Sequence, residues 1–101
     1  MSQMPKFYQK LQKDYKEVME AVDRLGKAVQ NAGPLDEKVT QLIKLAAAAT
    51  QKSEGAVHSH ARRAMEAGAS PEEIRHAVIL LVPTIGYPNA AAALSWVQDL
   101  L

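Results

Sequence analysis

The chain has 101 residues, a length that predicts one domain around one hydrophobic core. Its 12 Lys and Arg residues nearly balance 11 Asp and Glu residues, so the charge indicates neither a nucleic-acid partner nor an anionic membrane. The sequence has no cysteine, which excludes disulfides, thiolate metal sites and thiol catalysis. A chain this short is only marginally stabilised as a monomer, so association between copies is expected.

The first six residues contain no apolar run behind a basic stretch, so no signal peptide is expected. The longest apolar runs, 45–49 and 77–83, are far shorter than the ~20 residues that span a bilayer. We therefore expect a cytoplasmic protein with no membrane partner.

Residues 5–31 are expected to form one long helix. Apolar side chains recur along it at alternating spacings of three and four residues, and polar residues fill the opposite face. Such a stripe predicts packing against a neighbouring helix, from the same chain or from another subunit. The stripe consists of Tyr8, Leu11, Tyr15, Val18, Val22, Leu25 and Val29.

Gly33 and Pro34 predict the end of this first helix, because proline cannot continue it. Asp36 then suits the N-cap of a second helix. Ser53 suits the N-cap of a third, which Gly68 ends.

Ser70, Pro71 and Glu73 predict the start of a fourth helix, with an N-cap serine, a first-turn proline and a capping-box glutamate. Its run 77–82 is apolar all round, which predicts burial on every side. A last helix is expected over residues 88–101. Because no segment alternates like a strand, the expected fold class is all-α with about five helices.

The third predicted helix places His60 on a face made mainly of small and apolar residues. A histidine there is a candidate general acid or base, because its pKa of ~6.5 lies near neutrality. The alternative is a core histidine satisfied by a hydrogen bond. The face comprises Ser53, Ala56, Val57, His60 and Ala64.

The other two histidines do not complete a metal site with His60. His58 lies about 160° from it around the helix, so the pair cannot bind one ion. His58 and Arg62 are expected on a solvated surface, and His76 is expected in the interior. No metal and no cofactor are predicted.

Residues 35–101 resemble the carboxymuconolactone decarboxylase and alkylhydroperoxidase-D-like (AhpD-like) superfamily. The matching segments are Leu42–Ala46, His60–Ser70, Glu72–Ile74 and Gly86–Pro88. One domain is expected over 1–101, with 1–33 as a long N-terminal helix and 35–101 as the family-matching helical core. The resemblance implies a homo-oligomer, a trimer or a hexamer, with sites near the subunit contacts.

In the peroxidase branch of this superfamily, the active helix carries Cys-x-x-Cys-x-x-x-His and the preceding helix supplies a glutamate. The corresponding positions here are Ser53, Ala56 and His60, with Gln41 at the glutamate position. A serine hydroxyl cannot replace a thiolate in peroxide reduction, because it is far less acidic and forms no disulfide. Peroxidase activity is therefore not expected.

The decarboxylase branch does not require cysteine. The resemblance to it implies cofactor-free decarboxylation of a small lactone acid, with His60 as proton donor or acceptor. Three interpretations stay open: a lyase-type enzyme built around His60, a relative of the peroxidases in which Ser53 replaces a cysteine, or a non-enzymatic oligomeric domain. The candidate catalytic residues are His60, Ser53 and Gln41.

Overall fold

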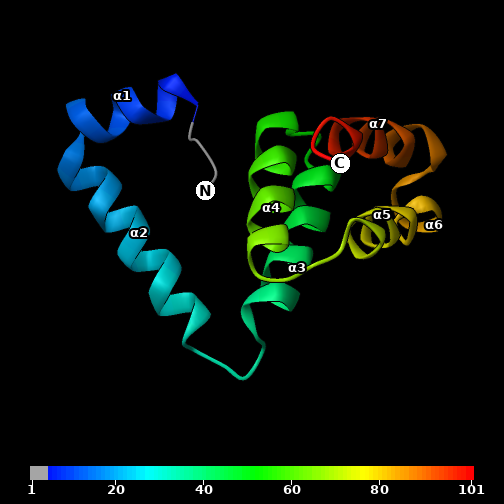
Figure 1. Ribbon diagram of the computed structural model, residues 1–101, viewed down its shortest axis with the longest axis horizontal. Helices are drawn as coiled ribbons and strands as arrows, with labels where there is room; N and C mark the ends of the chain where they lie inside the picture. Colours follow the sequence, from blue (N-terminus) through cyan, green and yellow to red (C-terminus); the bar gives the residue numbers. More distant parts are fainter. Residues whose placement is uncertain (1–4) are drawn as a thin grey trace. The chain divides into compact units, whose positions relative to one another are not determined.

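The computed structural model describes residues 5–101, which form seven helices and no strand (Figure 1). The predicted all-α class is confirmed. The chain divides into two compact units, Met1–Leu35 and Asp36–Leu101, and each is described by itself. No helix within residues 5–101 is both long and apolar enough to cross a membrane.

The first unit contains two helices, α1 (Lys6–Asp14) and α2 (Lys16–Gln30), where one helix over 5–31 was predicted. The prediction is wrong at Tyr15, whose φ of −130° and ψ of 51° lie outside the helical region. Tyr15 donates its N–H to the Leu11 carbonyl at 2.8 Å, and its own carbonyl accepts from Met19 at 3.0 Å. Tyr15 is thus both the C-cap of α1 and the N-cap of α2, and the chain bends at this residue. The domain prediction extends this N-terminal helix over 1–33, and residues 1–4 of that range lie outside the described residues.

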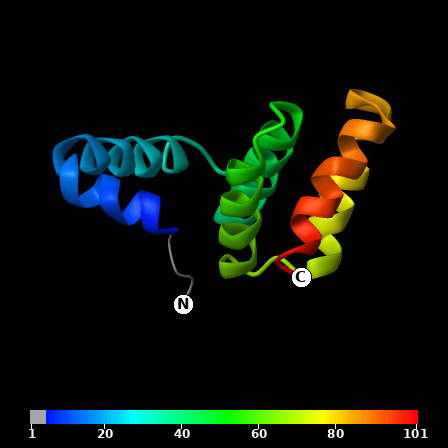
Figure 2. The same ribbon diagram turned by 90° about the horizontal axis from the view of Figure 1, so that it is seen from above.

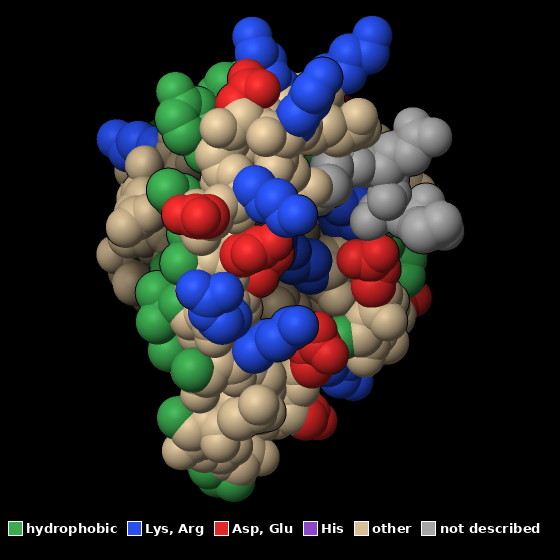
Figure 3. Space-filling model, turned by 90° about the vertical axis from the view of Figure 1, so that its left-hand side faces the viewer, with side chains coloured by type: hydrophobic (Ala, Val, Ile, Leu, Met, Phe, Trp, Pro, Cys, Tyr) green, Lys and Arg blue, Asp and Glu red, His purple; other side chains and the backbone are tan. Residues whose placement is uncertain are grey.

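Neither α1 nor α2 contains a buried residue. The predicted stripe is amphipathic as expected, but most of it is exposed, with Val22 54 % and Leu25 63 % accessible. The face of the molecule drawn in Figure 3 mixes Lys and Arg side chains with Asp and Glu. This unit therefore has no core of its own among its described residues.

The second unit contains five helices. α3 and α4 form a helical hairpin, α5 and α7 lie side by side against it, and the short α6 precedes α7 (Figures 1 and 2). Their bounds are α3 (Glu37–Thr50), α4 (Glu54–Glu66), α5 (Pro71–Ile79), α6 (Val82–Ile85) and α7 (Tyr87–Gln98).

Three predicted helix ends are confirmed. The Asp36 side chain accepts a hydrogen bond from the Val39 N–H at 2.9 Å and caps α3. Ser70 and Glu73 form the capping box of α5, each side chain accepting from the other's backbone N–H, at 3.1 and 2.9 Å. Gly68 follows α4 with a φ of +103°, a left-handed conformation that favours glycine.

The apolar run 77–82 was predicted to be buried on every side, and this prediction is wrong. Ile79 is 48 % and Leu80 60 % exposed. α5 ends at Ile79, and Pro83 lies in the first turn of α6, where its missing N–H costs no helical hydrogen bond. The predicted fourth helix is thus divided into two, and only one face of α5 packs inward.

The core lies where the hairpin meets α5 and α7. Its five largest fully buried side chains come from these four helices: Leu45, Val57, Ile74, Val78 and Val97. Buried alanines between them allow close approach of the helix backbones. The hairpin turn contains Lys52 with a φ of +57°, in the left-handed region. This core fixes the hairpin that carries the candidate site.

Candidate functional site

The α3–α4 hairpin brings Gln41 and His60 into contact. His60 Nδ1 lies 2.8 Å from Gln41 Oε1, across 19 positions of sequence. Gln41 is buried, with 7 % of the residue exposed, and it is the one buried polar residue within 5–101, while His60 is half-buried. The packing of the hairpin therefore holds the imidazole at the edge of the core.

This contact fixes the protonation pattern of the His60 ring. An amide oxygen can only accept a hydrogen bond, so Nδ1 carries the proton and donates it. In the neutral ring the lone pair is then on Nε2. The arrangement presents Nε2 as a proton acceptor.

The surroundings favour the neutral form of His60. Burial lowers the pKa of His60 below its ordinary value, and the positive charges of Arg63 and Lys44 lower it further. Lys44 lies one turn after Gln41 on α3, and Arg63 lies one turn after His60 on α4. Because the two helices of a hairpin run in opposite directions, these cations lie on either side of His60 along the helix axes. Their charges favour an anion beside the ring.

Of the three predicted site residues, the structure brings Gln41 and His60 together and places Ser53 farther away. Ser53 precedes α4, seven residues before His60, a rise of roughly 10 Å. Its N–H donates to the Ala48 carbonyl at 3.1 Å, and its carbonyl accepts from Val57 at 2.9 Å. It occupies the predicted N-cap position, although its hydroxyl caps no N–H of the described helix α4.

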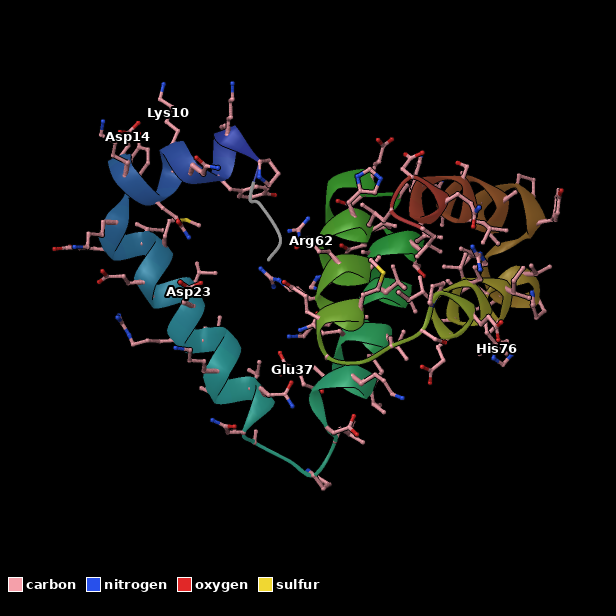
Figure 4. The ribbon with its side chains drawn as sticks, in the orientation of Figure 1. Lys10, Asp14, Asp23, Glu37, Arg62 and His76 are labelled. Atoms are coloured by element: carbon pink, nitrogen blue, oxygen red, sulfur yellow. The ribbon has the colours of Figure 1, made fainter. Side chains whose placement is uncertain are left out.

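Two predictions about the other histidines are wrong. His58 is partly buried rather than solvated, because the end of α7 packs beside α4: its Nε2 lies 3.0 Å from the Trp96 carbonyl and 3.5 Å from the Asp99 carboxylate. His76 is exposed on α5 rather than interior, because it points away from the core (Figure 4). Arg62 extends outward from α4 (Figure 4). Within residues 5–101 no three His, Asp or Glu side chains converge on a possible metal position.

The sequence did not single out Lys44 or Arg63 as neighbours of His60. Their spacing of three residues from Gln41 and His60 is a usable signal only once the two helices are known to pair. Two apolar cavities were also missed. One of about 380 Å³ lies between α3 and α5, and one of about 280 Å³ lies between α5, α6 and α7. Neither of these cavities is lined by His60.

Comparison with known proteins defines the family. Residues 16–99 match the model of the carboxymuconolactone decarboxylase family. The chain belongs to this family. It is 34 % identical over 89 residues to an uncharacterized protein of Methanocaldococcus jannaschii, a match covering 88 % of this chain and 83 % of that protein.

The fold of this family member is also known from a solved relative. The structure matches an apo crystal structure of a carboxymuconolactone decarboxylase family protein from Legionella pneumophila with a TM-score of 0.77. The sequences are 27 % identical, and the match covers 93 % of this chain and 87 % of the other. Family and helical architecture thus agree with the resemblance seen in the sequence.

Proposed function

We propose that this chain is a cofactor-free, lyase-type enzyme that decarboxylates a small lactone acid, with His60 as the proton-transfer group. The observation that carries the proposal is the 2.8 Å contact of His60 Nδ1 with Gln41 Oε1, which leaves the Nε2 lone pair available. Membership of the carboxymuconolactone decarboxylase family supports the reaction class. The absence of cysteine from the sequence agrees with chemistry that needs no thiol.

The proposed reaction needs one proton transfer in each direction. Nε2 of His60 accepts the proton of the substrate carboxyl group that is to be lost. The bond between the carboxyl carbon and the ring carbon then breaks, carbon dioxide leaves, and the electron pair is delocalised toward the lactone carbonyl. The imidazolium then gives its proton to the ring carbon that lost the carboxyl group, and His60 is neutral again. Gln41 Oε1 accepts from Nδ1 throughout and keeps Nε2 as the reacting atom.

The two cations near His60 support an anionic substrate. Lys44 and Arg63 both lower the pKa of His60, so both are close enough for their charge to be felt at the ring. A carboxylate beside the ring would be attracted by the same charges. We assign these two side chains the role of positioning the substrate's carboxylate groups.

The direct test measures carbon dioxide release from carboxymuconolactone and related lactone acids by the purified chain. We expect His60→Gln to lower kcat by roughly 10²–10⁴-fold, the usual contribution of a general acid or base. Gln41→Leu should lower kcat less, because the imidazole remains but its tautomer is no longer fixed. Lys44→Met should raise KM more than it lowers kcat, since its proposed role is binding.

The matched control is His76→Gln, which changes an exposed histidine of α5 by the same substitution. It should leave kcat and KM unchanged. Equal activity of the wild-type chain and His60→Gln, or no turnover of any lactone acid by the wild-type chain, would overturn the proposal. The latter result would favour a non-enzymatic domain.

A second candidate rests on the same contact. Gln41 and His60 occupy the positions that the resemblance assigns to the glutamate and histidine of the peroxidase branch, and these two side chains touch. Ala56, at the position of the second cysteine, lies one turn before His60. The chain would then be a peroxidase relative that has lost its thiols at Ser53 and Ala56.

This second candidate is tested by peroxide consumption with a dithiol reductant. The double variant Ser53→Cys/Ala56→Cys should consume peroxide: one thiolate is oxidised to a sulfenic acid as the peroxide is reduced to an alcohol or water. The other thiol then forms a disulfide with release of water, and the reductant restores both thiols. The wild-type chain should be inert. An inert double variant that still forms its disulfide would contradict this candidate.

A further inference from the structure

The second nitrogen of the His60 ring decides what can bind beside it. Nδ1 lies 2.8 Å from Gln41 Oε1 and donates its proton to that oxygen. In the neutral ring Nε2 is then an acceptor, and the oxygens of an ionised carboxylate or a sulfate are acceptors too. Neutral His60 therefore makes no hydrogen bond to an oxyanion. With a proton on Nε2 the ring donates on both sides and can form a charge-assisted hydrogen bond to one.

The cations around His60 favour an anion at this place. Lys44 of α3 and Arg63 of α4 both act on the ring. His58 and Arg62 each lie two positions from His60, roughly 160° around α4. The other basic side chains of the second unit are exposed or bonded elsewhere: Lys38, Lys52, Arg75 and His76. The ring thus lies beside two positive charges.

The carboxylates of the second unit lie away from the His60 ring. On α5, Glu73 lies 3.0 Å from Lys38. At the end of α7, Asp99 lies 3.5 Å from His58. The carboxylates outside these pairs are exposed, and those on the α3–α4 hairpin lie at least one helical turn from the ring along the helix axes. They are Glu37, Glu54 and Glu66 on the hairpin and Glu72 on α5. A bound anion would therefore supply the negative charge that the ring lacks.

A carboxylate ligand does not bring the proton that Nε2 needs. A carboxyl group has a pKa of about 4, so it is charged at neutral pH. Burial and the two cations lower the pKa of His60, so the free ring is neutral there as well. A hydrogen bond between the ring and a carboxylate at neutral pH therefore requires one proton from solution. The charge of the carboxylate favours this protonation, because it offsets the charges of Lys44 and Arg63.

We infer that the His60 site binds a small oxyanion together with one proton, which is taken from solution onto Nε2. The inference rests on the site of the proposed function and names the form in which that site holds a carboxylate, beside an imidazolium. This pair of carboxylate and imidazolium is the state from which carbon dioxide leaves in the proposed reaction. Gln41 links binding to protonation, because a glutamate in its place would hold the ring as an imidazolium before any ligand binds.

Sulfate is the probe, because it is fully ionised near neutral pH and brings no proton of its own. Nitrogen-15 NMR of the His60 ring gives its titration midpoint without sulfate and with saturating sulfate, and chloride matches the ionic strength. We expect sulfate to raise the midpoint by roughly one pH unit or more. The exposed His76 ring is the internal control, and sulfate should leave its signals unchanged. An unchanged His60 midpoint in the sulfate complex would overturn the inference, and so would a chain that binds no sulfate.

The reciprocal effect is on affinity. Between the free and the sulfate-bound midpoints, the Kd for sulfate should rise roughly tenfold per pH unit, because sulfate binding and protonation favour each other equally. His60→Gln keeps Lys44 and Arg63, so it should still bind sulfate. Its Kd, followed by the backbone amide signals of α4, should be the same between about pH 5 and 8. A wild-type Kd that does not vary with pH, or an equal pH dependence in His60→Gln, would contradict proton uptake onto Nε2.

Gln41→Glu tests the role of the neutral amide. The carboxylate should hold His60 as an imidazolium in the free chain, with a midpoint above about 6.5 that sulfate raises little further. Sulfate should also bind this variant more weakly at neutral pH, because the site has lost one net positive charge. An unchanged fluorescence spectrum of Trp96, a residue of α7, shows that the second unit is still folded. A sulfate-induced rise equal to that of the wild-type chain would overturn the role of Gln41.

These measurements need no turnover, so they separate the inference from the proposed function. Sulfate binding with proton uptake, in a chain that decarboxylates no lactone acid, would support the inference and overturn the proposed function. Turnover of a lactone acid by a chain that binds sulfate without proton uptake would support the proposed function and overturn the inference.

Discussion

The α1–α2 unit and the α3–α7 unit use apolar residues in different ways. In α3–α7, Leu45, Ile74 and Val97 reach a shared core and are fully buried. In α1–α2, Val22 and Leu25 have the same apolar character and an equally regular spacing, yet both remain more than half exposed. Periodicity thus identifies the face of a helix that favours burial, while the presence of a complementary surface decides whether that face is buried. The candidate site lies in the unit that has such surfaces.

The largest expected effect is the difference in unfolding free energy lost when leucine is replaced by alanine in each of the two units. Leu45→Ala removes a fully buried side chain and should lower the free energy of unfolding by about 2–5 kcal/mol. Leu25→Ala removes a side chain that is 63 % exposed and should cost less than about 1 kcal/mol in dilute protein. Urea unfolding followed by Trp96, the single tryptophan, measures the second unit directly. Equal losses for the two variants would refute the contrast between the units.

A smaller effect concerns the starts of the helices. The side chain of Ser70 caps α5, whereas α1 and α2 start at Pro5 and Tyr15 without a side-chain cap. Ser70→Ala should lower the free energy of unfolding of the second unit by about 1 kcal/mol. Ser70→Asp, which keeps an acceptor at the N-cap, serves as the matched control and should restore most of the loss. An unchanged urea midpoint for Ser70→Ala would show that the capping box does not stabilise this unit.

A still smaller effect, of opposite sign, comes from the turn beside the site. Lys52 has a φ of +57°, a left-handed conformation that is unfavourable for a residue with a side chain. Lys52→Gly should therefore raise the free energy of unfolding by roughly 0.5–1 kcal/mol. Lys27→Gly, within α2, should instead reduce the helix content measured by circular dichroism. A lower midpoint for Lys52→Gly would mean that the Lys52 side chain stabilises the turn.

The sequence predicted the parts of the fold that local chemistry decides. Asp36, Gly68 and the Ser70–Glu73 capping box mark helix ends through hydrogen bonds that lie within a few residues. The break at Tyr15 was missed because neither proline nor glycine marks it. The exposure of Ile79 and Leu80 was missed because an all-apolar run does not show which face will find a partner.

The candidate site was predicted only in part. The resemblance named Gln41 and His60, but their contact depends on how α3 and α4 pair, which no local pattern encodes. His58 and His76 were misplaced for the same reason. The packing of α7 beside α4 buries His58, and the orientation of α5 exposes His76.

The smallest expected effect is the dependence of stability on pH. The pKa of His60 is lowered in the folded chain, so between that value and about 6.5 the unfolded chain binds more protons. Stability should therefore fall as pH decreases from about 6.5 and recover as pH rises above it. In His60→Gln this part of the dependence should disappear. An identical pH profile for both chains, measured by urea unfolding, would contradict the lowered pKa.

The most direct test of the central claim is nitrogen-15 NMR of the His60 ring through a pH titration, with Gln41→Leu and Lys44→Met beside the wild-type chain. We expect a neutral ring at pH 7 with the proton on Nδ1, and a titration midpoint below the ordinary value of about 6.5. In Gln41→Leu the proton of the neutral ring should no longer be held on Nδ1, so both tautomers should be populated. Lys44→Met should raise the titration midpoint of His60 by removing a nearby positive charge. A proton on Nε2 of the neutral ring, or a midpoint at or above about 6.5, would contradict the role of His60 as a proton acceptor held by Gln41.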